Sequence, residues 1–200
     1  VAPVESALEG IEGVTDDERI SHYLNKYDRF SVAPCSCRAT RRVLDQGCGH
    51  LEEDMCIQMG KGAEHFIRTG RAREITREEA LEILKRAEDN GLVHNLPNIE
   101  EVGDSAAICN CCGCSCFGLR AGLMFGARDA IRSNFEARID ETKCVACGMC
   151  VENCQANALK LGQKLCTKEP LAQPEQYKKM SNSLVSCCKN GWIIRTKPFW

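Results

Sequence analysis

The chain has 200 residues, of which 28 are acidic and 26 basic, and its formal net charge is −2. This balance argues against a general nucleic-acid binder, and the length allows one large or two small domains. The sequence shows no recognisable signal peptide and no run of about 18 apolar residues that could span a membrane, and from this we expect a cytoplasmic protein. The chain starts at Val1 rather than methionine, which indicates a trimmed N-terminus or a piece of a longer protein.

Sixteen of the residues are cysteines, and most of them lie in three tight groups. Such a density is typical of disulfide scaffolds or of metal sites. Disulfide scaffolds are usually short secreted chains, and cysteines this close together cannot pair with one another without strain. The sequence therefore favours metal ligation in a reducing compartment.

The first expected element is a helix over residues 16–28, after a loose lead-in over 1–14. Thr15 and Glu18 have the spacing of a capping box, in which each side chain accepts a hydrogen bond from the other residue's amide. Apolar residues then recur at helical spacing: Ile20, Tyr23, Leu24 and Tyr27.

The first cysteine group reads C-x-C-x10-C-x7-C and consists of Cys35, Cys37, Cys48 and Cys56. Four thiolates are the number that one [4Fe–4S] cluster needs, and a structural zinc site is the alternative. We expect these four to hold a cluster of their own. Arg38 has two equally weighted roles, offsetting a cluster's charge or lying on the surface. His50 is a possible substitute ligand, although a solvated loop histidine is favoured.

Residues 57–108 contain no cysteine and have ordinary helical patterning. We expect one helix over 61–69 and a second that begins with a capping box at Thr76 and ends before Gly91. The buried stripe of the second helix is Ala80, Leu81, Leu84 and Ala87, and a short extended segment follows at 92–94. We interpret this region as a spacer or docking surface and predict no DNA binding.

The densest group occupies residues 109–116, where five of eight residues are cysteines: Cys109, Cys111, Cys112, Cys114 and Cys116. Only some of them can ligate one cluster, because neighbouring side chains point in different directions. Small residues then recur every four positions from Gly118, which predicts a helix over 117–133. The N-terminus of such a helix favours a nearby anion.

The last group reads C-x2-C-x2-C-x3-C and consists of Cys144, Cys147, Cys150 and Cys154. Residues 134–162 resemble a bacterial-type 4Fe–4S ferredoxin, in which the first three thiolates of such a run hold one cluster and the fourth belongs to another. Gln155 stands where proline is usual, which makes the presentation of Cys154 less certain. A zinc knuckle is the alternative interpretation.

The resemblance implies how the last two groups pair. Cys116 would complete the cluster held by Cys144, Cys147 and Cys150. Cys154 would return to a cluster held by Cys109, Cys112 and one of Cys111 or Cys114. With the first group this makes three [4Fe–4S] clusters, at least one of them in 144–154. The roles of Cys166, Cys187 and Cys188 stay open.

We therefore expect an α+β fold in two parts. Residues 1–105 form a mainly helical N-terminal region with one four-cysteine cluster site, and residues 106–200 form a ferredoxin-like cluster domain with a basic C-terminal tail. The tail carries aromatic residues suited to an interface: Trp192, Phe199 and Trp200.

The whole pattern resembles multi-cluster iron–sulfur electron-transfer proteins of anaerobes. The resemblance implies relay of single electrons to or from a partner oxidoreductase, with a flavoprotein as the expected partner, in a hetero-oligomeric complex. No nucleotide-binding glycine motif or catalytic triad accompanies the cysteines, so we predict no catalytic residues and favour a non-catalytic subunit. The alternatives are a redox enzyme with a substrate-binding cluster, since Cys111-Cys112-Gly113 matches the CCG of heterodisulfide reductases, and a zinc-binding structural protein.

Overall fold

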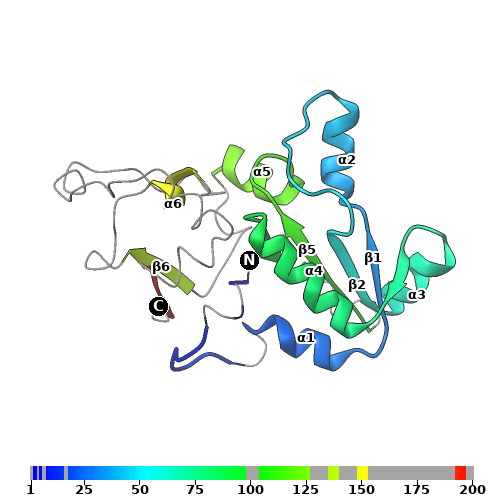
Figure 1. Cartoon of the computed structure of the whole chain (residues 1–200), viewed down its shortest axis with the longest axis horizontal. Coiled ribbons are helices and arrows are strands. Elements are labelled where there is room, and N and C mark those ends of the chain that lie inside the picture. The colour runs from blue at the N-terminus through cyan, green and yellow to red at the C-terminus, as the bar shows by residue number, and fades with distance from the viewer. Residues whose placement is uncertain are drawn as a thin grey trace, which may run out of the picture.

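The computed structural model describes residues 2–3, 5, 8–15, 18–97, 104–126, 135–139, 148–152 and 192–196. Most of these residues form a five-stranded antiparallel sheet with helices packed on it (Figure 1). The strand order is β3-β1-β2-β5-β4. The strands are β1 (Phe30–Ala33), β2 (Cys56–Gly60), β3 (Arg73–Ile75), β4 (Val93–Asn95) and β5 (Ser105–Cys111). The helices of this part are α1 (Ile20–Lys26), α2 (Ser36–Val43), α3 (Lys61–Arg68), α4 (Arg77–Asp89) and α5 (Phe117–Met124).

The later described residues form smaller elements. Strand β6 (Phe135–Ile139) pairs antiparallel with β7 (Trp192–Thr196), and α6 (Met149–Glu152) is a single helical turn. None of the helices among the described residues has the length and hydropathy that crossing a membrane requires.

The register of the sheet separates its two faces. Val32 lies opposite Ile57, which in turn lies opposite Ile108, so these three side chains share one face. Cys56 lies opposite Cys109, one residue along from that row. Because successive side chains of a strand point to opposite faces, the two cysteines lie on the other face of the sheet.

The apolar face of the sheet forms the core with α1 and α4. Its strand residues are fully or almost fully buried, as are the helix residues that cover them. Full burial of one large apolar side chain contributes about 1.5–3 kcal/mol, which makes this face the main source of stability. The cluster includes Ile20, Leu24, Phe30, Val32, Met55, Ile57, Met59, Ile83, Leu84, Ala87 and Ile108.

Helix α4 begins and ends where the sequence predicts. The side chain of Thr76 accepts a hydrogen bond from the backbone amide of Glu79 at 3.1 Å, so the capping box supplies the helix start. Gly91 has a φ of +73°, the left-handed conformation that glycine adopts after a helix end. The predicted stripe was wrong at Leu81, which is 46% exposed, because Ile83 occupies the buried position instead.

The other predicted helices are present with shorter limits. Glu18 accepts a hydrogen bond from the amide of Thr15, which is one half of the expected capping box, and α1 follows from Ile20. The helix predicted over 61–69 is α3. The helix predicted over 117–133 is α5, which ends at Met124 because Gly126 takes a φ of +64°. Residues 127–133 lie outside the described part.

The mixture of helix and sheet confirms an α+β structure, but the sheet itself was not predicted. The expected N-terminal helices are arranged around five strands, of which the sequence indicated only the segment near 92–94. The expected division between residues 105 and 106 falls at the start of β5, which pairs with both β2 and β4. Residues 105–111 therefore lie in the same sheet as the N-terminal region.

Candidate metal centre

Three neighbouring strands bring cysteines that are far apart in the sequence together at one end of the strands. We call this end of the sheet the cysteine edge. Cys35 follows β1, Cys56 begins β2, and Cys109 and Cys111 lie at the end of β5. Because β1, β2 and β5 are antiparallel neighbours, the end of β1, the start of β2 and the end of β5 coincide. Segments separated by more than 50 residues of sequence thus contribute to one place.

Six thiols at this edge are neighbours in a closed ring, which we call the six-cysteine ring. Two further members come from the adjoining helices: Cys37 lies in the first turn of α2, and Cys116 is the N-cap of α5. Each thiol interacts with the next one around the ring. The order is Cys35, Cys37, Cys116, Cys111, Cys109 and Cys56, which returns to Cys35.

Hydrogen bonds within the ring favour thiolates at two positions. Cys37 accepts from Cys116 and Cys35, and these bonds hold the pKa of its thiol far below the ordinary value. Cys109 accepts from Cys111 and Cys56, which likewise lowers its pKa. Negative charge is therefore favoured on opposite sides of the ring, and the thiolate is the form of cysteine that binds metal.

Backbone amides of two helices point at the ring. In the first turn of α2, the amide of Ser36 acts to lower the pKa of the Cys56 thiol, and that of Arg38 acts to lower the pKa of the Cys35 thiol. In the first turn of α5, the amide of Phe117 acts to lower the pKa of the Cys37 thiol, and that of Leu119 acts to lower the pKa of the Cys116 thiol. The free amides of a helix start carry partial positive charge, so both helices stabilise anionic sulfur here.

Arg38 adds a full positive charge beside the ring. It is only 3% exposed, so the surface-arginine interpretation was wrong. Its guanidinium donates to the carbonyl of Leu51 at 2.6 Å and to the carbonyl of Asn110 at 2.6 and 3.0 Å. Its charge lowers the pKa of the neighbouring Cys37 thiol, although the hydrogen bonds to that sulfur are the larger cause. A buried cation held by carbonyls is costly unless an anion balances it, and the ring supplies that anion.

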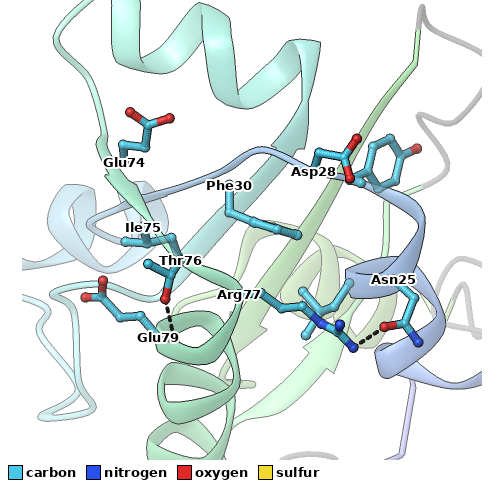
Figure 2. A pocket seen from close by; sticks show the side chains of 10 residues that line it. Asn25, Asp28, Phe30, Glu74, Ile75, Thr76, Arg77 and Glu79 are labelled. Atoms are coloured by element: carbon cyan, nitrogen blue, oxygen red, sulfur yellow. Dashed lines mark hydrogen bonds between the residues drawn. The ribbon is translucent and has the colours of Figure 1, made fainter.

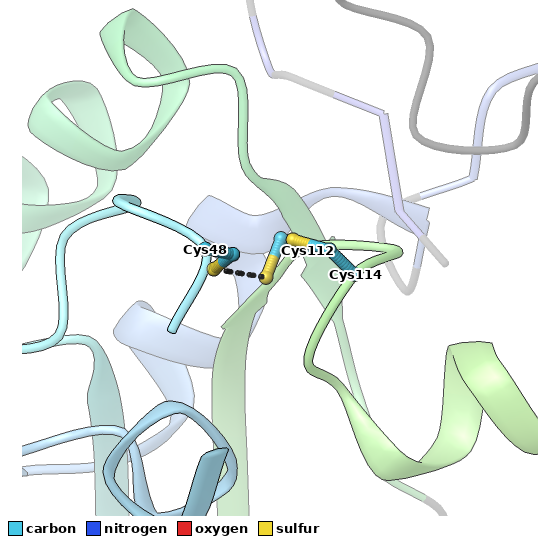
Figure 3. Close-up of side chains that lie close together, drawn as sticks. All are labelled: Cys48, Cys112 and Cys114. Carbon is cyan, nitrogen blue, oxygen red and sulfur yellow. Dashed lines mark hydrogen bonds between the residues drawn. The ribbon is translucent and has the colours of Figure 1, made fainter. Parts of the chain in front are cut away.

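Three other cysteines form a second, smaller group. Figure 3 shows Cys48, Cys112 and Cys114 with their side chains close together. The Sγ atoms of Cys48 and Cys112 are 3.8 Å apart, and all three Sγ atoms lie within 4.8 Å of one another. Cys112 is fully buried, Cys48 is half-buried and Cys114 is exposed. We call this set the three-cysteine site.

The hydroxyl of Ser115 donates to Cys48 Sγ at 3.2 Å. Burial would raise the pKa of Cys48, but hydrogen bonds from Ser115, from the amide of His50 and from the other two thiols lower it to about 7. The Cys48 thiol therefore titrates close to neutral pH.

The structure divides the predicted ligands differently from the sequence analysis. Cys48 was grouped with Cys35, Cys37 and Cys56, but its thiol lies with Cys112 and Cys114. The adjacent Cys111 and Cys112 belong to different groups, as the expectation about neighbouring side chains requires. Cys48 is separated from Cys56 because of strand pairing. The pairing of β2 with β5 places Cys56 beside Cys109, whereas Cys48 lies in the loop before β2 and contacts Cys112.

The other predicted site residues either lie away from these two groups or lie outside the residues that the structure describes. His50 interacts with Asn90 through Nδ1 and is not a member of the three-cysteine site. Cys150 lies in α6 and is half-buried. The remaining cysteines lie outside the described residues: Cys144, Cys147, Cys154, Cys166, Cys187 and Cys188.

Asn110 and Ser115 are site residues that the sequence analysis missed. Asn110 lies between Cys109 and Cys111 on the opposite face of β5, and its carbonyl holds Arg38. The alternation of residues 105–111 was the available signal, since Ala106, Ile108 and Asn110 share one face of a strand. Nothing in the sequence around Ser115 indicated its contact with Cys48, which is 67 residues away.

A groove of about 590 Å³ lies away from the cysteines, at the start of β1 (Figure 2). Its lining includes Asp28, Phe30, Ile75 and Arg77, and it contains no cysteine. The metal-ligand chemistry of the described residues is therefore concentrated at the cysteine edge of the sheet.

Comparison with known families gives a match in the C-terminal half. A family model described as a 4Fe-4S binding domain matches residues 137–160, which contain the cysteine run from Cys144 to Cys154. No curated protein and no solved structure matches the chain. The match supports a ferredoxin-type domain with at least one 4Fe-4S cluster, and it indicates iron–sulfur electron transfer.

Proposed function

We propose that this chain is an iron–sulfur protein or subunit that relays single electrons through [4Fe–4S] clusters to or from a partner oxidoreductase. The observation that carries the proposal is the 4Fe-4S binding-domain match at residues 137–160. We assign Cys144, Cys147 and Cys150 to one cluster in this segment, because their spacing allows three thiolates to hold one cluster.

The six-cysteine ring is the second cluster site in this proposal. Four of its six thiolates would hold a [4Fe–4S] cluster, which supplies one-electron oxidation and reduction when bound. The donor set fits such a group: the ring offers sulfur ligands only, the amides of the two helix starts act to lower the pKa of four of the thiols, and the buried Arg38 balances negative charge. Hydrogen bonds to sulfur and nearby charge are the features by which a protein sets a cluster's potential.

Cys116 belongs to the ring in this proposal, because its thiol contacts Cys37 and Cys111. This differs from the assignment that the ferredoxin resemblance implied, in which Cys116 completed the cluster of the 144–150 run.

The partner in this proposal is a flavin-containing oxidoreductase that binds the chain in a hetero-oligomeric complex. The sequence has no nucleotide-binding motif, so the chemistry at either end of the relay needs another protein. Exposed apolar side chains on and after α5 support an interface near the cysteines: Phe117 is 78%, Met124 70% and Phe125 80% exposed. The basic tail with Trp192, Phe199 and Trp200 supplies aromatic and charged groups for the same purpose.

We place the protein in the reducing cytoplasm of an anaerobic organism. The ten described cysteines are all free thiols, and metal-ligating cysteines need to be kept reduced.

Replacement of Cys147 by serine tests the cluster assignment. The variant should lose about four iron and four sulfide per chain and one EPR signal of the reduced protein, because one ligand of the cluster is gone. Cys166→Ser, at the isolated cysteine, is the matched control and should keep both. Unchanged iron, sulfide and EPR in the Cys147 variant would contradict the assignment.

Native mass measurement after purification at moderate ionic strength tests the partner. We expect a complex with a flavin-containing chain. A monomer that still reduces a small substrate when supplied with low-potential electrons alone would contradict the partner proposal and favour a redox enzyme.

A further inference from the structure

The three-cysteine site differs from the six-cysteine ring in size. Its three Sγ atoms all lie within 4.8 Å of one another, and it is the sole group of His, Cys, Asp or Glu ligand atoms among the described residues that meets this limit. The ring thiols contact their neighbours in sequence around the ring, but no three of them are mutually this close. The ring is therefore wide, and the three-cysteine site is compact.

This difference separates two kinds of metal chemistry. Zn–S bonds of about 2.3 Å place the sulfurs of a tetrahedral site about 3.8 Å apart, and the Cys48 and Cys112 Sγ atoms are 3.8 Å apart. In a [4Fe–4S] cluster each thiolate binds a different iron, so the thiolates are spread around a larger inorganic core. The compact arrangement fits one ion, and the wide ring fits a cluster.

We propose that Cys48, Cys112 and Cys114 bind a single thiophilic divalent cation, with Zn²⁺ as the fitting ion, at a site separate from the [4Fe–4S] clusters. Three thiolates are soft ligands of the kind that select zinc over hard cations such as Mg²⁺ and Ca²⁺. Among the described residues the site offers three ligands, so a solvent molecule completes a four-coordinate site. The exposed Cys114 gives the ion a route from solvent.

Neighbouring groups prepare Cys48 to be a ligand. The Ser115 hydroxyl donates to its sulfur at 3.2 Å, which orients the Cys48 side chain. Groups that hydrogen-bond to a ligand orient it and increase the affinity of the site.

The bound ion would join two segments that also serve the ring. Cys48 lies in the loop between α2 and β2, which also contains the Leu51 carbonyl that accepts from Arg38. Cys112 and Cys114 lie in the turn between β5 and α5, directly before the ring member Cys116. A metal bond between residues 48 and 112 closes a long segment of chain, and it fixes both loops against the ring.

The inference goes beyond the proposed electron transfer and competes with the third [4Fe–4S] cluster that the cysteine count suggested. The test uses the full chain, purified anaerobically and reconstituted with iron, sulfide and Zn²⁺ all available. Three proteins are compared by metal and sulfide analysis and by X-ray absorption at the zinc edge: the wild type, Cys114→Ser and Cys37→Ser. Cys114 is exposed, so its replacement should leave the fold intact.

We expect one zinc per wild-type chain, with Zn–S distances of about 2.3 Å. Cys114→Ser should weaken zinc binding at least about tenfold and keep its iron and sulfide, because one of three thiolates is lost. Cys37→Ser should keep the zinc and lose about four iron and four sulfide per chain, those of the ring cluster. If the chain binds zinc in this way but holds neither iron nor sulfide, the inference stands and the proposed function fails.

Three results would overturn the inference. The first is loss of iron and sulfide from Cys114→Ser, which would assign Cys114 to a cluster. The second is the absence of zinc from the reconstituted wild type while its clusters are present. The third is a Cys48–Cys112 disulfide, detected by mass in the anaerobically purified chain, because a disulfide would remove two of the three ligands.

Discussion

Replacement of Arg38 by methionine tests whether the buried guanidinium holds the cysteine edge together. Methionine keeps much of the side-chain volume, so the packing change is small. The change removes hydrogen bonds from the guanidinium to the carbonyls of Leu51 and Asn110. Asn110 is 1% exposed, so its carbonyl loses these bonds with little access to water, whereas Leu51 is partly exposed and its carbonyl can bind water instead.

The expected cost follows from these two carbonyls. A buried polar group left without its partner costs about 1–3 kcal/mol, and a carbonyl that regains water costs about 0.5–1.5 kcal/mol. Removal of a buried charge from the metal-free protein offsets part of this loss. We therefore expect Arg38→Met to lower the free energy of unfolding of the reduced, metal-free chain by about 2 kcal/mol.

The measurement is anaerobic denaturant unfolding, with Arg42→Met as the matched control. Arg42 lies on the same helix, but its side chain is 66% exposed and its partner is the carboxylate of Glu52, whose side chain is 18% exposed. An exposed ion pair of this kind contributes about 0–1 kcal/mol. Equal, small losses for Arg38→Met and Arg42→Met would refute the reasoning, because they would show that the buried hydrogen bonds contribute no more than a surface pair.

The remaining predictions concern the helix cap, a glycine and a thiol. Thr76→Ala should lower the free energy of unfolding by about 1 kcal/mol, since it removes the cap of α4; Thr69→Ala, at an exposed threonine outside any N-terminal cap, should cost less in the same unfolding assay. Gly60→Ala should cost clearly more than Gly70→Ala: both have positive φ, which costs about 1–2 kcal/mol without glycine, but only at residue 60 would a Cβ meet a backbone oxygen at 2.4 Å. In the metal-free chain, alkylation of Cys48 should reach half its maximum rate at about pH 7. Because folding lowers this pKa from 9.0, the stability that Cys48 contributes is complete above pH 9 and is lost as the pH falls through about 7; a half-maximum near 9 in the folded chain would contradict this.

Local signals in the sequence predicted helices α1, α3, α4 and α5, but neither α2 nor the sheet. The cap at Thr76 and the glycine at 91 lie within a few residues of the helix they delimit, so a short window contains the information. Strands β1 and β3 are only four and three residues long, and β1 is buried throughout. A short, wholly buried strand has no alternating pattern, so periodicity cannot distinguish it from other apolar segments.

The division of the cysteines depended on long-range pairing that spacing alone does not contain. The sequence identified every cysteine of both groups as a candidate ligand, because their density favours metal binding. It assigned Cys48 to its neighbours in sequence, whereas the pairing of β2 with β5 joins Cys56 to Cys109. A fragment that stopped at residue 105 would lack β5 and half of the ring, so it is not suitable for testing a separate metal site.

Iron and sulfide analysis of the full chain, with and without the ring, tests the central claim most directly. The protein is purified anaerobically, and the wild type is compared with the double variant Cys37→Ser/Cys109→Ser. This variant lacks the two ring thiols whose pKa values are lowered. We predict equal iron and sulfide in the wild type, and a loss of about four of each in the variant, which should retain the cluster of residues 144–154. Two results would contradict the account. One is that the variant contains as much iron and sulfide per chain as the wild type, and the other is that the wild type contains zinc and no sulfide.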